Sequence, residues 1–240
     1  MLPEIQIVEN LGVRYAIFQS RDFISHIVRQ TGQFELALVE DTEKLLKDVN
    51  EGYVLDIGSN MGTYGVPLAV RNPNLTVLCF EPQRIIYNQL CTNITINRLD
   101  NVYAYNVAVS DHEDTIELKM PDYMQEENIG GFSLDPLVKE KCPTSQGKTE
   151  TVNVVTIDSI GLANVKMIKI DVEGLELEVL KGATETIKNS NYPPLILEAW
   201  NQYEWWDARK EEMFDYVKSL GYNIEDSSWV NNYLAVHPGK

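Results

Sequence analysis

Five acidic residues stand at or just beyond the carboxyl ends of apolar runs: Asp56, Glu81, Asp171, Glu173 and Glu198. If these runs are parallel strands of one sheet, their carboxyl ends meet at one edge, where open α/β sheets bind their ligands. Carboxylates gathered there repel one another, which raises the pKa of at least one of them toward neutral pH. The pattern predicts acid–base chemistry beside a bound ligand.

Lys169 is the residue that fits its surroundings least. It lies inside VKMIKI (165–170), which reads as a central parallel strand with apolar side chains on both faces. A buried ammonium is costly unless it is paired. Because side chains alternate along a strand, Lys169 and Asp171 point to the same side. We expect Lys169 to pair with a carboxylate and to orient it.

A glycine-studded turn, VLDIGSNMGTYG (54–65), follows the first apolar run. In the dinucleotide fingerprint G-x-G-x-x-G the second glycine lets the backbone approach a pyrophosphate. Here Asn60 takes that place, between Gly58 and Gly62. S-adenosylmethionine has no phosphate, and its carboxylate can lie at the N-terminus of a helix over 62–71. The turn therefore favours S-adenosylmethionine as the cofactor, bound by Asp56, Gly58, Asn60 and Gly62.

Further cofactor contacts are expected at the ends of the next two apolar runs. Glu81 ends LCFE and is placed to accept hydrogen bonds from the two ribose hydroxyls, a feature that NAD sites share. Asn106 would hydrogen-bond the adenine edge, and Val107 would pack on the ring. An asparagine at such a position is also a common turn former.

Short β-branched runs alternate with amphipathic stretches from Gly52 onward, which predicts an α/β fold with a mostly parallel, doubly wound sheet. Strands are expected at 53–57, 76–80, 102–107, 165–170 and 194–199, with a closing hairpin at 221–225 and 230–236. Helices are expected at 62–71, 84–97, 174–189 and 206–219, and in two pieces within 21–48. Residues 1–50 are thus a helical lead-in, and residues 51–240 form the main domain.

The interval 111–157 breaks this alternation after the third strand. It holds two polar strand candidates, at 115–120 and 151–155, on either side of a segment rich in glycine, proline and serine. We interpret it as a small insertion over the sheet edge. A long loop of this kind, here 121–148, is either a lid over a functional site or disordered.

The composition predicts an acidic globular protein. A net charge of −16, from 36 acidic and 20 basic residues, disfavours nucleic acid as a partner. Three cysteines without C-x-x-C spacing are expected to be reduced, and neither a signal peptide nor a membrane-spanning run is recognisable, so a cytoplasmic location is expected. The acidic edge offers oxygen ligands for a divalent metal, although no residue spacing requires one. Nothing indicates the oligomeric state.

Several segments resemble the FkbM family of S-adenosylmethionine-dependent methyltransferases: VLDIGSNMGTYG, FEPQ, NVAVS with a later IDS, and above all IKIDVEGLELEVLKGA. The resemblance runs from GQFE (32–35) to NNYLAVH (231–237). It implies a Rossmann-like class I methyltransferase fold with an antiparallel last strand, and O-methylation of a hydroxyl on a sugar, glycan, lipid or secondary metabolite. Ser59 departs from the alanine frequent in the family, and WNQYEWW (200–206) has no counterpart there.

Methyl transfer to an alcohol requires alignment of the acceptor with the sulfonium and a base for the hydroxyl proton. Asp171 is the predicted base and Glu173 the alternative, with Lys169 orienting the carboxylates. Asp171 also fits two other roles, capping the next helix or holding the methionine amino group. Glu198 and Trp200 are expected to contact a small-molecule or glycan acceptor, with Glu198 alternatively pairing with Lys169.

Two other functions stay open at this point. An NAD(P)-linked oxidoreductase would fit the fold, but the dinucleotide fingerprint and a Tyr/Lys or His catalytic pair are missing. A catalytically silent cofactor-binding or scaffold protein would also fit. The intact glycine turn and the acids at the strand ends argue against it.

Overall fold

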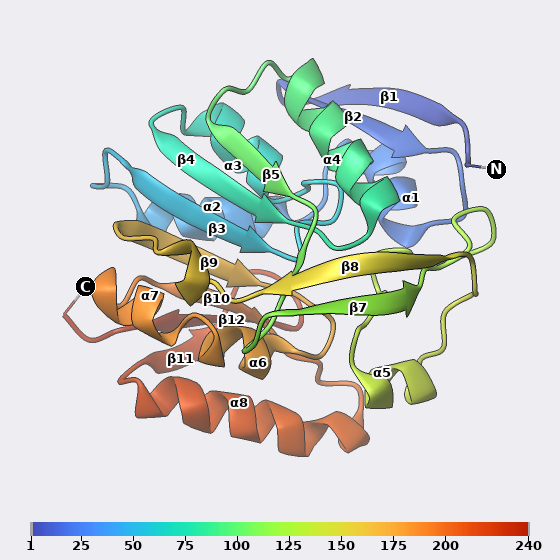
Figure 1. The fold of residues 1–240 in the computed structure, drawn as a ribbon. Helices are drawn as coiled ribbons and strands as arrows, with labels where there is room; N and C mark the ends of the chain where they lie inside the picture. The colour runs from blue at the N-terminus through green and yellow to red at the C-terminus, as the bar shows by residue number, and fades with distance from the viewer. Residues whose placement is uncertain (1, 240) are drawn as a thin grey trace.

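A seven-stranded sheet forms the centre of the computed structural model, which describes residues 2–239 (Figure 1). Its strand order is β11-β12-β10-β9-β3-β4-β5. Strands β10, β9, β3, β4 and β5 are parallel to their neighbours in that series, whereas β12 runs antiparallel to β10 and β11. The bounds are β3 (Gly52–Ile57), β4 (Leu75–Phe80), β5 (Val102–Tyr105), β9 (Val165–Ile170), β10 (Leu195–Glu198), β11 (Asn223–Asp226) and β12 (Asn232–Val236). The predicted doubly wound sheet with an antiparallel last strand is confirmed.

Helices cover both faces of this sheet because its side chains alternate between two apolar cores. On β3, Val54 joins one core and Leu55 the other. The first core takes side chains from α1 (Phe23–Thr31), α2 (Leu36–Leu45), α3 (Gly65–Arg71) and α4 (Arg84–Ile96). The second takes them from α6 (Glu176–Lys181), α7 (Thr184–Asn189) and α8 (Asp207–Ser219).

Residues 5–18 differ from the expected helical lead-in. They form an antiparallel hairpin of β1 (Ile5–Asn10) and β2 (Val13–Phe18), and the helices begin only at Phe23. Exposed and half-buried residues alternate through β1, which is the period of a strand rather than of a helix. Helix α4 holds the hairpin, since Ala16 N donates to Asn93 Oδ1 at 2.6 Å and Gln89 Nε2 donates to Ala16 O at 2.7 Å.

The single helix expected at 174–189 is two short helices, α6 and α7. The chain turns between them at Gly182, where the backbone of Ser110 comes so close that a Cβ would lie 2.1 Å from its carbonyl oxygen. The contact ties the helix pair to the start of the insertion.

The predicted insertion supplies two strands of a second sheet, whose order is β6-β8-β7, and the third strand, β6, lies just before it. The strands of this sheet are β6 (Ala108–Val109), β7 (Asp114–Lys119) and β8 (Thr149–Val155), and α5 (Pro136–Lys141) lies in the long loop between β7 and β8 (Figure 1). Two contacts fasten that loop: Ile129 N donates to Asp22 Oδ1 at 3.0 Å, and Arg209 pairs with Asp135. The loop thus bridges α1 and α8.

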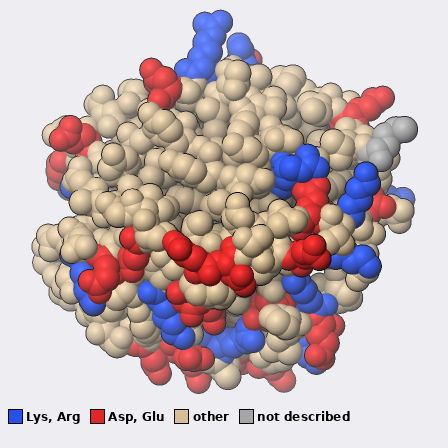
Figure 2. All heavy atoms as spheres, in the orientation of Figure 1, with Lys and Arg blue, Asp and Glu red and all other residues tan. Residues whose placement is uncertain are grey.

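Acidic side chains form a band across the lower half of the face in Figure 2, whereas the upper half is mostly uncharged. This distribution agrees with the net charge of −16. No helix among residues 2–239 is both long and apolar enough to cross a membrane.

Gly58 directly follows β3 and lies against the backbone of Asp171, which directly follows β9. Its φ is +82°, and a Cβ there would lie 1.7 Å from the carbonyl oxygen of Asp171. Both the positive φ and this close approach require glycine.

We predict that Gly58→Ala lowers the free energy of unfolding by at least about 2 kcal/mol, since left-handed strain adds to a backbone clash. Gly161→Ala is the control, because Gly161 also has a positive φ (+70°) but no atom lies within 4 Å of its Cβ position. It should lose only about 1 kcal/mol, from strain alone. Urea denaturation measures both, and equal losses would contradict the close approach.

Candidate functional site

A cavity of about 380 Å³ opens at the carboxyl ends of β3, β4, β9 and β10. The loop between β7 and β8 forms part of its wall through Gly130, Gly131 and Leu134. Most residues that we predicted for the site line it: Gly58, Asn60, Glu81, Val107, Lys169, Asp171, Glu173, Glu198 and Trp200. The sheet therefore brings together residues from five separate segments.

Glu81 joins the glycine turn to the end of β4. Its Oε2 accepts a hydrogen bond from Asn60 N at 2.9 Å, and its Oε1 accepts one from Gln83 N at 2.8 Å. Burial raises the pKa of Glu81 to about 7, although these two amides lower it. The carboxylate is thus held in place with lone pairs left for a ligand's hydroxyls.

The expected anion site would lie at the start of a helix over 62–71. Helix α3 begins later, at Gly65. Met61 N donates to Asn60 Oδ1 at 2.7 Å, Gly62 N to Ser59 O at 2.8 Å and Gly65 N to Asp56 Oδ2 at 3.1 Å. These local hydrogen bonds leave fewer free amides for an anion than the sequence pattern predicts.

Three predicted cofactor ligands lie outside the cavity wall. Asp56 is fully buried beneath the turn, where it holds the start of α3. Gly62 serves packing, because a Cβ there would meet Val66 at 2.7 Å. Asn106 Nδ2 donates to the carbonyls of Glu81 and Pro82, so it fastens the loop beside the site. All three support the site from behind.

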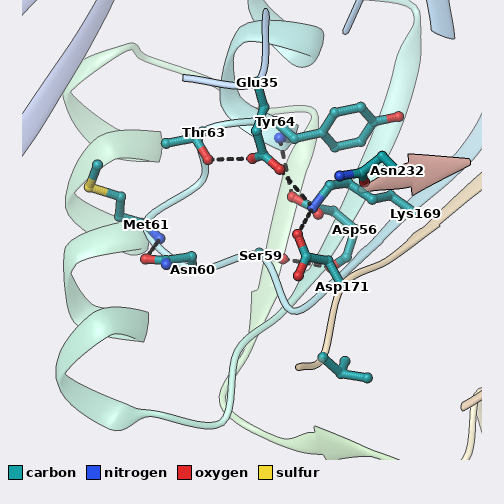
Figure 3. Close-up of polar contacts among 12 residues, drawn as sticks. Glu35, Asp56, Ser59, Asn60, Met61, Thr63, Tyr64, Lys169, Asp171 and Asn232 are labelled. Atoms are coloured by element: carbon teal, nitrogen blue, oxygen red, sulfur yellow. Dashed lines mark hydrogen bonds and ion pairs between the residues drawn. The ribbon is translucent and has the colours of Figure 1, made fainter. Parts of the chain in front are cut away.

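Lys169 is the centre of a buried charge cluster (Figure 3). Its side chain is 1% exposed, and Nζ lies 2.9 Å from Asp171 Oδ2 and 3.2 Å from Glu35 Oε1. Asp56 is its direct neighbour in the β3–β9 ladder. Burial alone would lower the pKa of Lys169, but Asp171, Glu35 and Asp56 outweigh it and hold the pKa well above its ordinary value. The predicted Lys169–Asp171 pair is present.

Sequence reasoning missed Glu35 as a site residue. It precedes α2 with a φ of +58°, lines the cavity, and its Oε2 accepts a hydrogen bond from Thr63 Oγ1 at 2.7 Å. Only the GQFE segment of the family resemblance pointed to it. Glu35 lies far from Lys169 in the sequence, so no local pattern marks the pair.

A second group of carboxylates consists of Asp171, Glu173 and Glu198. Asp171 belongs both to this group and to the cluster around Lys169. One oxygen of each acid in the group lies within 4.8 Å of the others, close enough to hold a metal ion. Burial first, and then the neighbouring carboxylates, raises the pKa of Glu173 and of Glu198 well above the ordinary value. A positive charge brought close to these two acids would lower both pKa values.

Aromatic side chains border this acid group. Trp200 and Tyr203 line the cavity, with ring centroids 5.7 Å apart at 83°. Trp206 is buried and packs on Trp200 and Val138, so it belongs to a local core behind the wall. The segment that had no family counterpart thus supplies both a wall and its support.

We predict that Lys169→Met destabilises the protein by about 3 to 5 kcal/mol, the usual cost of removing one partner of a buried ion pair. The loss should be larger at about pH 8 than at about pH 5.5. Burial already raises the pKa of Asp56 to about 7 from 3.8, although Lys169 lowers it. The folded state therefore binds the Asp56 proton more tightly than the unfolded state does, and the stability that this proton contributes is lost as pH rises through 7. Removing Lys169 removes the charge that lowers this pKa, so the variant loses more stability than the unaltered protein over this range.

Urea denaturation of both proteins at the two pH values tests this prediction. Adding Glu35→Gln to the variant should recover part of the loss at the higher pH, because one of the repelling carboxylates is gone. An equal loss at both pH values would instead assign the effect to packing.

Curated relatives of this chain are methyltransferases. The chain is 28% identical over 162 residues to methyltransferase sdnD of Sordaria araneosa, which covers 55% of this chain and 61% of the relative. It is 27% identical over 156 residues to the hexuronic acid methyltransferase AglP of Haloferax volcanii, covering 62% and 57%. The chain thus spans about three fifths of the length of these relatives.

Solved structures share the fold at low identity. TYW2 from P. horikoshii in complex with MeSAdo aligns with a TM-score of 0.50 at 13% identity, over 96% of this chain and 69% of that one. A putative rRNA methylase from Clostridium thermocellum aligns with a TM-score of 0.50 at 11% identity, over 83% and 93%. The expected Rossmann-like class I methyltransferase fold is confirmed.

The family model described as the methyltransferase FkbM domain matches residues 56–224. This match includes the glycine turn, Glu81, the strand with Lys169 and the acids at 171 to 198. It confirms both the resemblance and the prediction of S-adenosylmethionine as the cofactor. The chain therefore belongs to the FkbM family of S-adenosylmethionine-dependent methyltransferases.

Proposed function

We propose that this protein transfers the methyl group of S-adenosylmethionine to a hydroxyl oxygen of a small-molecule or glycan acceptor. The observation that carries the proposal is the position of Asp171, whose carboxylate lines the cavity and is held by Lys169 at 2.9 Å. A held carboxylate beside the cofactor turn is suited to accept a hydroxyl proton. The hexuronic acid methyltransferase among the relatives supports a carbohydrate-like acceptor.

Residues on the β3–β4 side of the cavity would hold the cofactor. Glu81 is placed for the ribose hydroxyls, Gly58 and Asn60 for the backbone approach, and Val107 for the adenine ring. Bound S-adenosylmethionine would supply an electrophilic methyl group on its sulfonium. The acceptor half of the cavity then lies over β9 and β10, beside Glu198 and Trp200.

In the proposed reaction the acceptor oxygen forms a bond to the methyl carbon as the bond from carbon to sulfur breaks, and the sulfonium becomes a thioether. The hydroxyl proton passes to Asp171, which Lys169 keeps oriented. Glu173 is the alternative base, since it lines the same cavity. Much of the acceleration would come from alignment of the acceptor with the methyl group.

The first test is calorimetric titration with S-adenosylhomocysteine, with NADH as the control ligand. We expect micromolar binding of the former alone. Binding without methyl transfer to any hydroxylated sugar or metabolite would favour the silent scaffold instead. The enzyme assay uses a labelled methyl donor with a panel of such acceptors.

We predict that Glu81→Ala weakens S-adenosylhomocysteine binding by at least about tenfold, because the ribose hydroxyls lose their acceptor. Glu113→Gln, an exposed substitution in the insertion, should leave the affinity unchanged. Calorimetry measures both, and thermal denaturation verifies that the variants are folded. An unchanged affinity in the first variant would place the ribose elsewhere.

Asp171→Asn should leave S-adenosylhomocysteine affinity within about threefold and lower turnover at least about 100-fold, since an amide cannot take the proton. Glu173→Gln should lower turnover less. If Asp171→Asn abolishes binding, the residue belongs to the cofactor pocket and the base is another group. Single-turnover methyl transfer separates the two cases.

A further inference from the structure

The cavity is strongly unbalanced in charge. Its described lining contains five carboxylates, from Glu35, Glu81, Asp171, Glu173 and Glu198, and one basic residue, Lys169. Lys169 is already shared by Glu35 and Asp171. No lining arginine or second lysine is available among residues 2–239 to meet a negatively charged ligand.

Three of these five carboxylates have defined partners. Glu81 accepts from two backbone amides, Glu35 from Thr63, and both Glu35 and Asp171 pair with Lys169. S-adenosylmethionine would add its own charges on the cofactor side of the cavity. These acids are therefore explained by the cofactor and the base.

Glu173 and Glu198 are not explained in this way. Their carboxylates have no hydrogen-bond or ion-pair partner among the described residues, yet both are partly buried and line the cavity. With Asp171 they place three carboxylate oxygens within 4.8 Å of one another. Two partly desolvated acids side by side cost free energy unless a cation lies between them.

We propose that the acceptor carries an ammonium group next to its reactive hydroxyl, as in an amino alcohol or an amino sugar. The inference rests on the proposed function and names the class of its acceptor. An ammonium has three donors, so it can be shared by Glu173 and Glu198 while the neighbouring hydroxyl faces Asp171. The opposite charge also favours the ionised form of both acids.

The aromatic wall supports the same assignment. Trp200 and Tyr203 line the same cavity, and indole and phenol rings attract cations through their faces. An acceptor with a carboxylate, such as a hexuronic acid, would meet three acids and no free cation at this end. The acceptor class that we infer is therefore not the hexuronic acid for which the Haloferax relative is named.

The test uses S-adenosylhomocysteine analogues in which nitrogen replaces sulfur and carries a two-carbon arm into the acceptor half. One arm ends in an amine, one in a hydroxyl and one in a carboxylate. Calorimetry should give at least tenfold tighter binding for the aminoethyl arm than for the hydroxyethyl arm, and the weakest binding for the carboxymethyl arm. Because the cofactor half is constant, the ranking reports only the charge at the end of the arm.

The double variant Glu173→Gln, Glu198→Gln should bring the three affinities within about threefold of one another. S-adenosylhomocysteine itself should bind this variant as tightly as it binds the unaltered protein. Glu204→Gln is the matched control, because Glu204 is exposed in the same neighbourhood but does not line the cavity. It should preserve the full ranking.

Equal or tighter binding of the carboxymethyl arm would overturn the inference. So would a hydroxyethyl arm that becomes the tightest ligand with magnesium but not with EDTA, since the positive charge would then come from a metal ion on the same three acids. Failure of S-adenosylhomocysteine to bind the unaltered protein would instead refute the proposed function. The two failures are therefore distinguishable.

Discussion

An ammonium buried in the centre of a sheet is the constraint on which the rest of this site depends. Lys169 has almost no contact with water, so its charge must be compensated by carboxylates brought from elsewhere in the chain. Asp171 comes from the same strand and Glu35 from the start of α2. Helix α2, strand β9 and the glycine turn consequently have to meet at one point, and that point is the floor of the cavity.

The parts of this arrangement that depend on local periodicity could be predicted from the sequence. Alternation along one strand placed Lys169 beside Asp171, and the apolar runs located the strands of the main sheet. The pairing with Glu35 could not be predicted, because it depends on how α2 packs against the sheet. Asp56 was misjudged for a related reason: sequence shows a residue at a strand end but not whether a turn will bury it.

The glutamate side chains that line the cavity differ in their surroundings. The carboxylate of Glu81 is fixed by two backbone amides, whereas those of Glu173 and Glu198 have other carboxylates as their neighbours. Only the first arrangement prepares a carboxylate to accept hydrogen bonds from neutral hydroxyls. In the proposed function one half of the cavity therefore holds the nucleoside of the cofactor, and the acceptor matches the acidic side chains of the other half.

The floor and the wall of the cavity differ in how they are connected to the rest of the fold. The floor belongs to the main sheet and its buried charges, whereas part of the wall comes from the loop between β7 and β8, fastened by a few side-chain contacts. Substitutions in the floor disturb folding, and the loop also contributes to folding because its Tyr123 and Ile129 belong to the first apolar core. Exposed loop residues that line the cavity, such as Asn128, are therefore the positions where the wall can change while the core stays intact.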